Sequence, residues 1–153
     1  MNELPTIYLD MDGTIADLYS VPHWLDYLLA ENTTPYRAAR PLLSSTQIDF
    51  LETYIEMGGS VAIISWTSKN GSRRYNQAVR SAKVNWLKRH LPLSYAEIHV
   101  IKYGTPKSKF GKKGDILVDD EGQNIMDFRK NGKLAFHPND WEDMENYLIQ
   151  LIG

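Results

Sequence analysis

The sequence predicts a protein of the α/β class, built as a three-layer α/β/α sandwich around a mainly parallel sheet. Two observations support this fold class. Short apolar runs rich in β-branched residues recur along the chain, and segments whose apolar residues have helical spacing separate most of them. Several runs are apolar almost throughout, which is typical of strands buried on both faces of a parallel sheet. The length of 153 residues suits a single domain, residues 1–153.

Five apolar runs are the predicted strands of this sheet. They read TIYLD (6–10), SVAIIS (60–65), EIHVI (97–101), DILVDD (115–120) and KLAFH (133–137). Parallel strands are joined by right-handed crossovers, so we expect helices to cover the sheet on both sides.

Three segments have the pattern of amphipathic helices. In residues 72–91, which end before Pro92, the apolar stripe consists of Tyr75, Val79, Ala82 and Trp86. The basic residues of this segment lie mostly off the stripe; they are Arg73, Arg80, Lys83 and Lys88. Residues 45–57 form a second helix, ended by the pair Gly58-Gly59, and a C-terminal helix starts with Asn139 or Asp140 as N-cap.

The segment between the first two strands is longer than one crossover requires. Within it, VPHWLDYLLAEN (21–32) predicts an extra helix, and TTPYRAARP (33–41) is rich in turn residues. An insertion at this point would stand over the carboxyl ends of the strands. We therefore expect a small helical cap at about residues 16–44, which could act as a lid.

The composition excludes several classes of protein. The hydrophobic fraction of 42% fits a globular chain, and the formal net charge of −2 provides no overall basic field for nucleic-acid binding, although a local patch is not excluded. Without cysteine there is neither a disulfide nor a thiolate metal site. No signal peptide and no run of about 18 apolar residues is present. We therefore expect a cytoplasmic protein without a membrane partner.

Two aspartate pairs follow predicted strands. Asp10 and Asp12 end the first strand, and Asp119 and Asp120 end a later one. In a Rossmann-like sheet, ligands bind outside the carboxyl ends of the strands. Residues i and i+2 of an extended segment point the same way, so Asp10 and Asp12 can converge on one point. If the two strands are neighbours, three or four carboxylates meet in one crevice.

Such a group of carboxylates repels itself unless a proton or a cation intervenes. Mg²⁺ prefers oxygen ligands and keeps water positions open for phosphate oxygens, so it is the expected metal. The alternative interpretation is structural: DMDGT would be a strand end with an Asp-Gly turn, and Asp120 would cap a helix. The presence of both pairs, each after an apolar strand, favours the metal site.

Polar groups at other strand ends could complete this site. Ser65 closes the second strand and is followed by Trp66 and Thr67. A lysine-rich segment, KYGTPKSKFGKKGD (102–115), precedes the acidic strand. For any one of these lysines a solvated loop is the simpler interpretation, but one lysine that reaches the site would offset phosphate charge.

Together these motifs resemble the haloacid dehalogenase (HAD) superfamily of phosphotransferases over nearly the whole chain. DMDGT (10–14) matches its first motif, DxDxT, and VAIIS (61–65) matches its second, which places the motif hydroxyl on Ser65. DILVDD (115–120) matches the acidic fourth motif. GDILVDD and the following GQNIMDFRKNGKLAFH further resemble the 5'(3')-deoxyribonucleotidase group and its phage and bacterial relatives. In that group the motif lysine lies six residues before the Asp of GD, which selects Lys109; the alternatives are Lys107 and Lys112.

The resemblance implies Mg²⁺-dependent hydrolysis of a phosphomonoester through an aspartyl-phosphate. Asp10 would be the nucleophile, and Asp12 would be the general acid and then the general base. The metal ligands would be Asp10, the main-chain carbonyl of Asp12, Asp119 and Asp120. Phosphoryl oxygens would be held by Ser65, Lys109 and backbone N–H groups after Asp10. Thr14 would fix the loop, and further candidates for substrate contact are Gly13, Trp66 and Thr67.

The substrate and two other classes of protein stay open at this point. The resemblance favours a nucleoside monophosphate, whose base could stack on Trp66 or on Tyr19, Trp24 and Tyr27 of the cap, although these rings could equally pack the cap onto the body. A polynucleotide end or another phosphoester is the alternative substrate. A response-regulator receiver domain has similar groups in a different order along the chain, and a non-catalytic phosphate-binding module would have no need of all the acidic residues.

Overall fold

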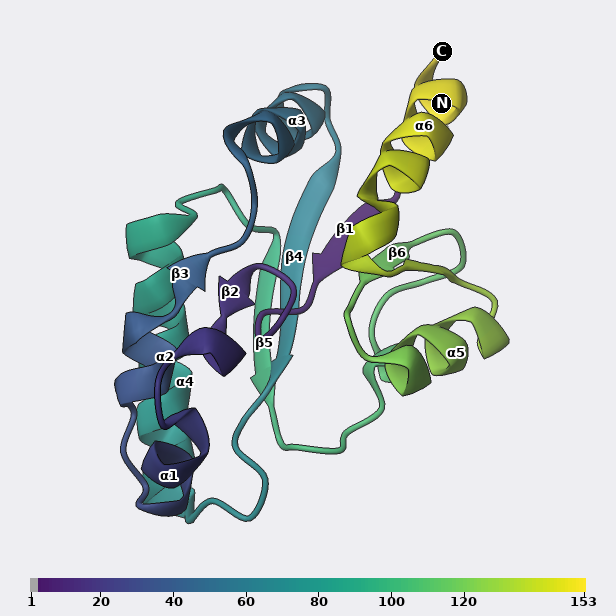
Figure 1. Ribbon diagram of the computed structural model, residues 1–153. Coiled ribbons are helices and arrows are strands. Elements are labelled where there is room, and N and C mark those ends of the chain that lie inside the picture. Colours follow the sequence, from purple (N-terminus) through teal and green to yellow (C-terminus); the bar gives the residue numbers. More distant parts are fainter. Residues whose placement is uncertain (1–2) are drawn as a thin grey trace.

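A five-stranded parallel sheet forms the centre of the protein. The computed structural model describes residues 3–153 (Figure 1). The sheet has the order β5-β4-β1-β6-β7, and every neighbouring pair is parallel. Its strands are β1 (Thr6–Leu9), β4 (Ser60–Trp66), β5 (Glu97–Ile101), β6 (Ile116–Val118) and β7 (Leu134–Phe136). This arrangement confirms the predicted α/β class and its mainly parallel, Rossmann-like sheet.

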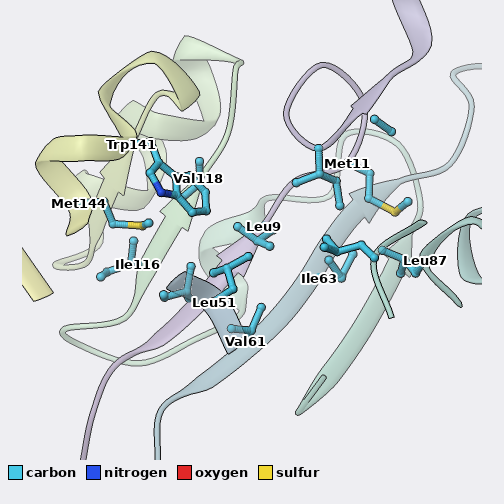
Figure 2. Close-up of a cluster of buried hydrophobic side chains, with 14 of the residues drawn as sticks. Leu9, Met11, Leu51, Val61, Ile63, Leu87, Ile116, Val118, Trp141 and Met144 are labelled. Carbon is cyan, nitrogen blue, oxygen red and sulfur yellow. The ribbon is translucent and has the colours of Figure 1, made fainter. Parts of the chain in front are cut away.

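Alternate residues of the central strands enter two separate cores, as expected for strands buried on both faces. On one face, Leu9, Ile63 and Val118 pack with residues of α3 (Ser45–Glu56), α4 (Arg73–His90) and α6 (Trp141–Ile152) (Figure 2). On the other face, Tyr8 and Ile64 pack with residues of α5 (Gly122–Lys130). The sheet therefore lies between two layers, of which the first is larger.

Local signals explain where the helices begin and end. At α3, Ser44 and Gln47 form a reciprocal capping box, and Gly58 follows the helix with a φ of 97°, a conformation that favours glycine. At α4, the Ser72 hydroxyl accepts from the backbone N–H of Tyr75. At α6, Asp140 occupies the predicted N-cap position but makes no side-chain capping bond. Helix α5 is an element that the apolar spacing alone did not predict.

The segment of residues 16–44 contains short elements. It comprises β2 (Ala16–Asp17), η1 (Leu18–Ser20), α1 (Trp24–Leu29), α2 (Thr34–Ala38) and β3 (Arg40–Pro41), and β2 and β3 pair antiparallel. Helix α2 packs on α4, and α1 packs on α2, at the left of Figure 1. Tyr36 of α2 is buried against Tyr75 and Val79 of α4. The sequence predicts a small helical cap for this segment, and its role as a cap stays a prediction.

The strand register brings the two aspartate pairs to the same edge of the sheet. Leu9 at the end of β1 pairs with Ile63 of β4 on one side and with Val118 of β6 on the other. Asp10 and Asp119 are the next residues along their strands, so they leave the sheet at one level. Two shorter 3-10 turns, η2 (Lys107–Lys109) and η3 (Pro138–Asp140), complete the described chain. Within residues 3–153, none of the helices is long and apolar enough to cross a membrane.

Candidate active site

Three carboxylates meet beyond the ends of β1 and β6. Oxygen atoms of Asp10, Asp119 and Asp120, which we call the carboxylate cluster, all lie within 4.8 Å of one another. Asp10 and Asp119 are buried, and all three residues line a cavity of about 380 Å³. The carboxylates that follow the two strands therefore lie close together, which the sequence analysis expected.

Lys107 supplies the positive charge of the cluster. Its Nζ lies 2.7 Å from Asp10 Oδ1 and 2.7 Å from Asp119 Oδ2. Burial by itself lowers the pKa of Lys107, but the two carboxylates raise it more, so its pKa lies above the ordinary value and the lysine is charged. The Asp119 carboxylate also accepts from the side-chain amide of Asn124 and the backbone N–H of Glu121.

Lys109, the lysine selected from the sequence, lies elsewhere. It is exposed, whereas Lys107 is buried, although both belong to the turn η2. A 3-10 turn has three residues per turn, so side chains two positions apart point in different directions. Lys112, the other alternative, forms an exposed ion pair with Glu3. The lysine that the structure brings to the carboxylates is thus Lys107.

Lys107 carries one positive charge, which does not balance the charges of three carboxylates. The pKa values of Asp119 and Asp120 both lie above the ordinary value. Burial, reinforced by the charge of Asp10, raises the pKa of Asp119 to about 6. The same two causes raise the pKa of Asp120 to about 7. The hydroxyl of Thr14 lies 3.0 Å from Asp10 Oδ2 and accepts from the backbone N–H of Asp120, which fixes the loop after β1 against the loop after β6. Thr14 therefore links the two loops, and it is not among the residues that line the cavity.

Asp12 does not join the carboxylate cluster. Its side chain lines the cavity, but its Oδ2 lies 2.7 Å from Lys83 Nζ. Burial raises the pKa of Asp12, and the ammonium of Lys83 opposes this shift only in part. Of the two aspartates expected to converge on one point, Asp10 thus turns to the cluster and Asp12 to a cation of its own.

Ser65 is completely buried, with 0% of its surface exposed, and it is not among the residues that line the cavity. Its Oγ lies 2.6 Å from Lys83 Nζ. The reason is strand alternation: Ser65 follows Ile63 on the face covered by α4, and β4 continues through Trp66. The hydroxyl residues that line the cavity after β4 are Thr67 and Ser68.

Besides Asn124, the sequence analysis missed Lys83 as a residue of this site. It lies on α4 and is 1% exposed. The helical stripe that contains Val79 and Trp86 also contains Lys83, at four residues and three residues from them, so the lysine faces the interior and not the polar side of the helix. A lysine at an apolar stripe position was the signal that could have identified it.

Gly13 is required for reasons of space. It has a φ of 83°, and a Cβ at this position would lie 2.3 Å from Asp120 Oδ2. Its N–H donates to the carbonyl of Ala16 at 2.8 Å. The structure thus places Gly13 as a close-packed turn residue, and its N–H is already engaged.

Aromatic and apolar side chains form much of the cavity wall. Trp66 and Tyr103 pack at 4.8 Å between ring centroids on the side of the sheet, and Tyr19 and Trp24 pack edge to face at 5.0 Å on the side of the 16–44 segment. Tyr27, the third ring expected there, is not among the lining residues. Leucines of η1 and α1 extend the wall; they are Leu18, Leu25, Leu28 and Leu29.

Several solved structures share this fold at low sequence identity. One chain in the structure of the Pnkp1/Rnl/Hen1 RNA repair complex is 17% identical, with a TM-score of 0.56 over 90% of this protein and 44% of that chain. D,D-heptose 1,7-bisphosphate phosphatase from B. bronchiseptica, in complex with magnesium and phosphate, is 10% identical, with a TM-score of 0.52 over 86% and 79% of the two chains.

A HAD family enzyme from Bacteroides thetaiotaomicron, in complex with magnesium and inorganic phosphate, is 9% identical, with a TM-score of 0.52 over 88% and 93% of the two chains. The protein spans less than half the length of the RNA-repair chain that it matches. No protein-family profile and no curated protein sequence matches it. The comparisons therefore establish a fold shared with HAD-family enzymes.

Proposed function

We propose that this protein is a Mg²⁺-dependent phosphomonoester hydrolase that forms an aspartyl-phosphate on Asp10. One observation carries the proposal: a cluster of three carboxylates, two of them buried, lies in a cavity beside a further aspartate, with a lysine between two of the three. The resemblance of the sequence motifs to the HAD superfamily supports the same assignment, because Asp10 of DMDGT and Asp119 and Asp120 of DILVDD are the residues that meet here.

The carboxylate cluster fits a magnesium ion. Its donors are hard oxygen atoms, and two of the three aspartates are buried. Burial and the negative charge of Asp10 raise the pKa values of Asp119 and Asp120, and a bound cation would offset both effects. Asp10, Asp119 and Asp120 would hold the ion, together with the main-chain carbonyl of Asp12. When bound, Mg²⁺ would neutralise and orient phosphate oxygens.

The residues of the chain divide the chemistry between them. The Asp10 carboxylate attacks phosphorus, forming a new P–O bond while the bond to the leaving alcohol oxygen breaks. Asp12 donates its proton to that oxygen and later removes a proton from the water that hydrolyses the aspartyl-phosphate, so Asp10 is regenerated and phosphate is released. Lys107 and Thr67, which both line the cavity, would bind the transferred phosphoryl oxygens.

We propose a nucleoside monophosphate as the substrate. The paired rings of Trp66 and Tyr103 and those of Tyr19 and Trp24 line the cavity that holds the carboxylates, and such faces stack on nucleobases. A small cap formed by the 16–44 segment would cover the base. This is the activity expected from the resemblance to the 5'(3')-deoxyribonucleotidase group.

The phosphorylated end of a polynucleotide is the second candidate. The wall extends to the surface of the molecule, where Leu29 is 76% exposed and Tyr19 is 51% exposed, so a longer chain has a path out of the cavity. The fold shared with a chain of an RNA repair complex supports including this candidate in the test.

A phosphate-release screen tests the proposal. The purified protein is assayed with Mg²⁺ or with EDTA on p-nitrophenyl phosphate, 5'- and 3'-nucleoside monophosphates of both sugars, sugar phosphates and 3'- or 5'-phosphorylated oligonucleotides. We expect repeated, Mg²⁺-dependent turnover that is highest on nucleoside monophosphates. Phosphorylation of the protein without repeated turnover would instead indicate a receiver-like module. The absence of a reaction with every substrate would refute the proposed enzymatic function.

A further inference from the structure

Lys83 is a buried lysine whose three N–H bonds all have acceptors. Its Nζ lies 2.7 Å from Asp12 Oδ2, 2.6 Å from Ser65 Oγ and 2.7 Å from the main-chain oxygen of Trp66. An ammonium group has three donors and no acceptor, so this set satisfies it completely. Burying such a charge is costly unless it is paired and hydrogen-bonded, and here it is both.

Two of the three acceptors belong to a rigid element. Ser65 and Trp66 are residues of β4, which is paired with both β1 and β5. The lysine itself is held by α4, a helix of 18 residues whose buried side supports the aliphatic stem. The ring of Tyr36 lies 5.1 Å from the ammonium and covers it from the side of α2. The position of the ammonium is thus determined without any contribution from Asp12.

Asp12, by contrast, lies in the loop that follows β1. Its side chain is 22% exposed and faces the cavity. The bond from Lys83 holds Oδ2, so the other oxygen, Oδ1, is the one left to meet a ligand in the cavity. A proton donor must lie within hydrogen-bond reach of the atom it protonates, and small misplacements are costly for rate.

We propose that Lys83 is a positioning residue, which holds the Asp12 carboxylate so that Oδ1 is directed at the leaving oxygen. This inference rests on the proposed phosphatase function, in which Asp12 is the general acid. It also assigns a role to Ser65, which acts as an acceptor that anchors the Lys83 ammonium and does not bind phosphate.

A lysine with only a structural role makes a different prediction. Its loss would lower the stability of the fold and reduce the activity on all substrates by the same factor. The loss of a residue that acts through the general acid affects a substrate in proportion to its need for that acid. Phenyl phosphate and p-nitrophenyl phosphate have similar shapes, but the p-nitrophenolate anion leaves with much less help from a proton.

The experiment compares Lys83→Met with Lys88→Met, a matched control on the exposed side of the same helix. We measure kcat/KM on both aryl phosphates, because this constant reports the step in which the phenol leaves. For Lys83→Met we expect a loss of about 100-fold on phenyl phosphate and of less than about 10-fold on p-nitrophenyl phosphate. Lys88→Met should resemble the wild type on both. Equal losses on the two substrates would overturn the inference.

A second measurement needs no turnover and separates this inference from the proposed function. In a crystal structure of Lys83→Met, we expect the Asp12 carboxylate to leave the orientation it has in the wild type, while Asp10 and Asp119 stay in place. An unchanged Asp12 would overturn the inference even if the wild-type protein hydrolyses no phosphoester. If Lys83→Met does not fold, Ser65→Ala removes one anchor only, and it should show the same dependence on the leaving group with a smaller loss.

Discussion

The carboxylate cluster predicts how the stability of the metal-free protein depends on pH. A carboxyl group whose pKa is higher in the folded than in the unfolded state holds its proton more tightly when folded. Asp119 and Asp120 have pKa values of about 6 and about 7, against an ordinary value of 3.8. The stabilisation of the folded state by the protons on these two groups is therefore fully present below pH 4, and it is lost as the pH rises through 6 to 7.

The size of this loss follows from the pKa values. A difference of one in pKa corresponds to about 1.4 kcal/mol, so the buried Asp119 accounts for about 3 kcal/mol. The larger shift of Asp120 must be discounted, because this residue is partly exposed and solvent screens it. Both shifts also share the charge of Asp10 as a cause, so they do not add. We expect the free energy of unfolding to fall by about 3 kcal/mol between pH 4 and pH 7.5 through this cluster.

Mg²⁺ should reverse the loss, because it supplies the missing positive charge. A ligand present at about 100 times its Kd stabilises the folded state by about 2.7 kcal/mol. For a chain of this length that gain corresponds to a rise in Tm of roughly 5 to 11 °C.

Urea unfolding at a series of pH values, in EDTA and in Mg²⁺, measures both effects. Asp120→Asn is the matched variant: it removes one of the ionising groups, so its stability in EDTA should fall less steeply between pH 4 and pH 7.5. The reasoning is refuted if the wild type and Asp120→Asn have the same pH profile in EDTA. It is refuted equally if Mg²⁺ at pH 7.5 leaves the Tm of the wild type unchanged.

Three further substitutions test the roles assigned to single residues. Asp10→Asn should abolish phosphate release while the circular dichroism spectrum is unchanged, and turnover at the native rate would show that Asp10 is not the nucleophile. Lys107→Met should lower kcat/KM by about 100-fold or more, through the loss of charge at the phosphoryl group, whereas Lys109→Met should stay near the wild type; the reverse result would restore the sequence-based choice. Gly13→Ala should lower the free energy of unfolding by more than the control Gly58→Ala, whose backbone is also left-handed but whose Cβ would meet no atom within 4 Å. The control should cost about 1 kcal/mol from backbone strain alone, and equal losses in the two variants would contradict the close contact at Gly13.

The sequence by itself determined the fold class and the place of the site. Strands such as SVAIIS are apolar on both sides, and only a sheet covered on both faces can bury them. Aspartates that directly follow two such strands must lie at the carboxyl edge of a parallel sheet. These inferences rest on local patterns, in which the relevant residues are neighbours along the chain.

Only the tertiary structure decided which side chains meet at that edge. Asp10 and Lys107 are separated by 97 positions, and Asp12 and Lys83 by 71, so no spacing along the chain reports their contact. The direction of a side chain also depends on its exact position in a strand or turn. Lys107 and Lys109 of η2 point in different directions, and strand alternation turns Ser65 away from the cavity. The physical reason is that a side chain's direction changes with each residue of a strand or turn, whereas its charge and polarity, which the sequence displays, do not change.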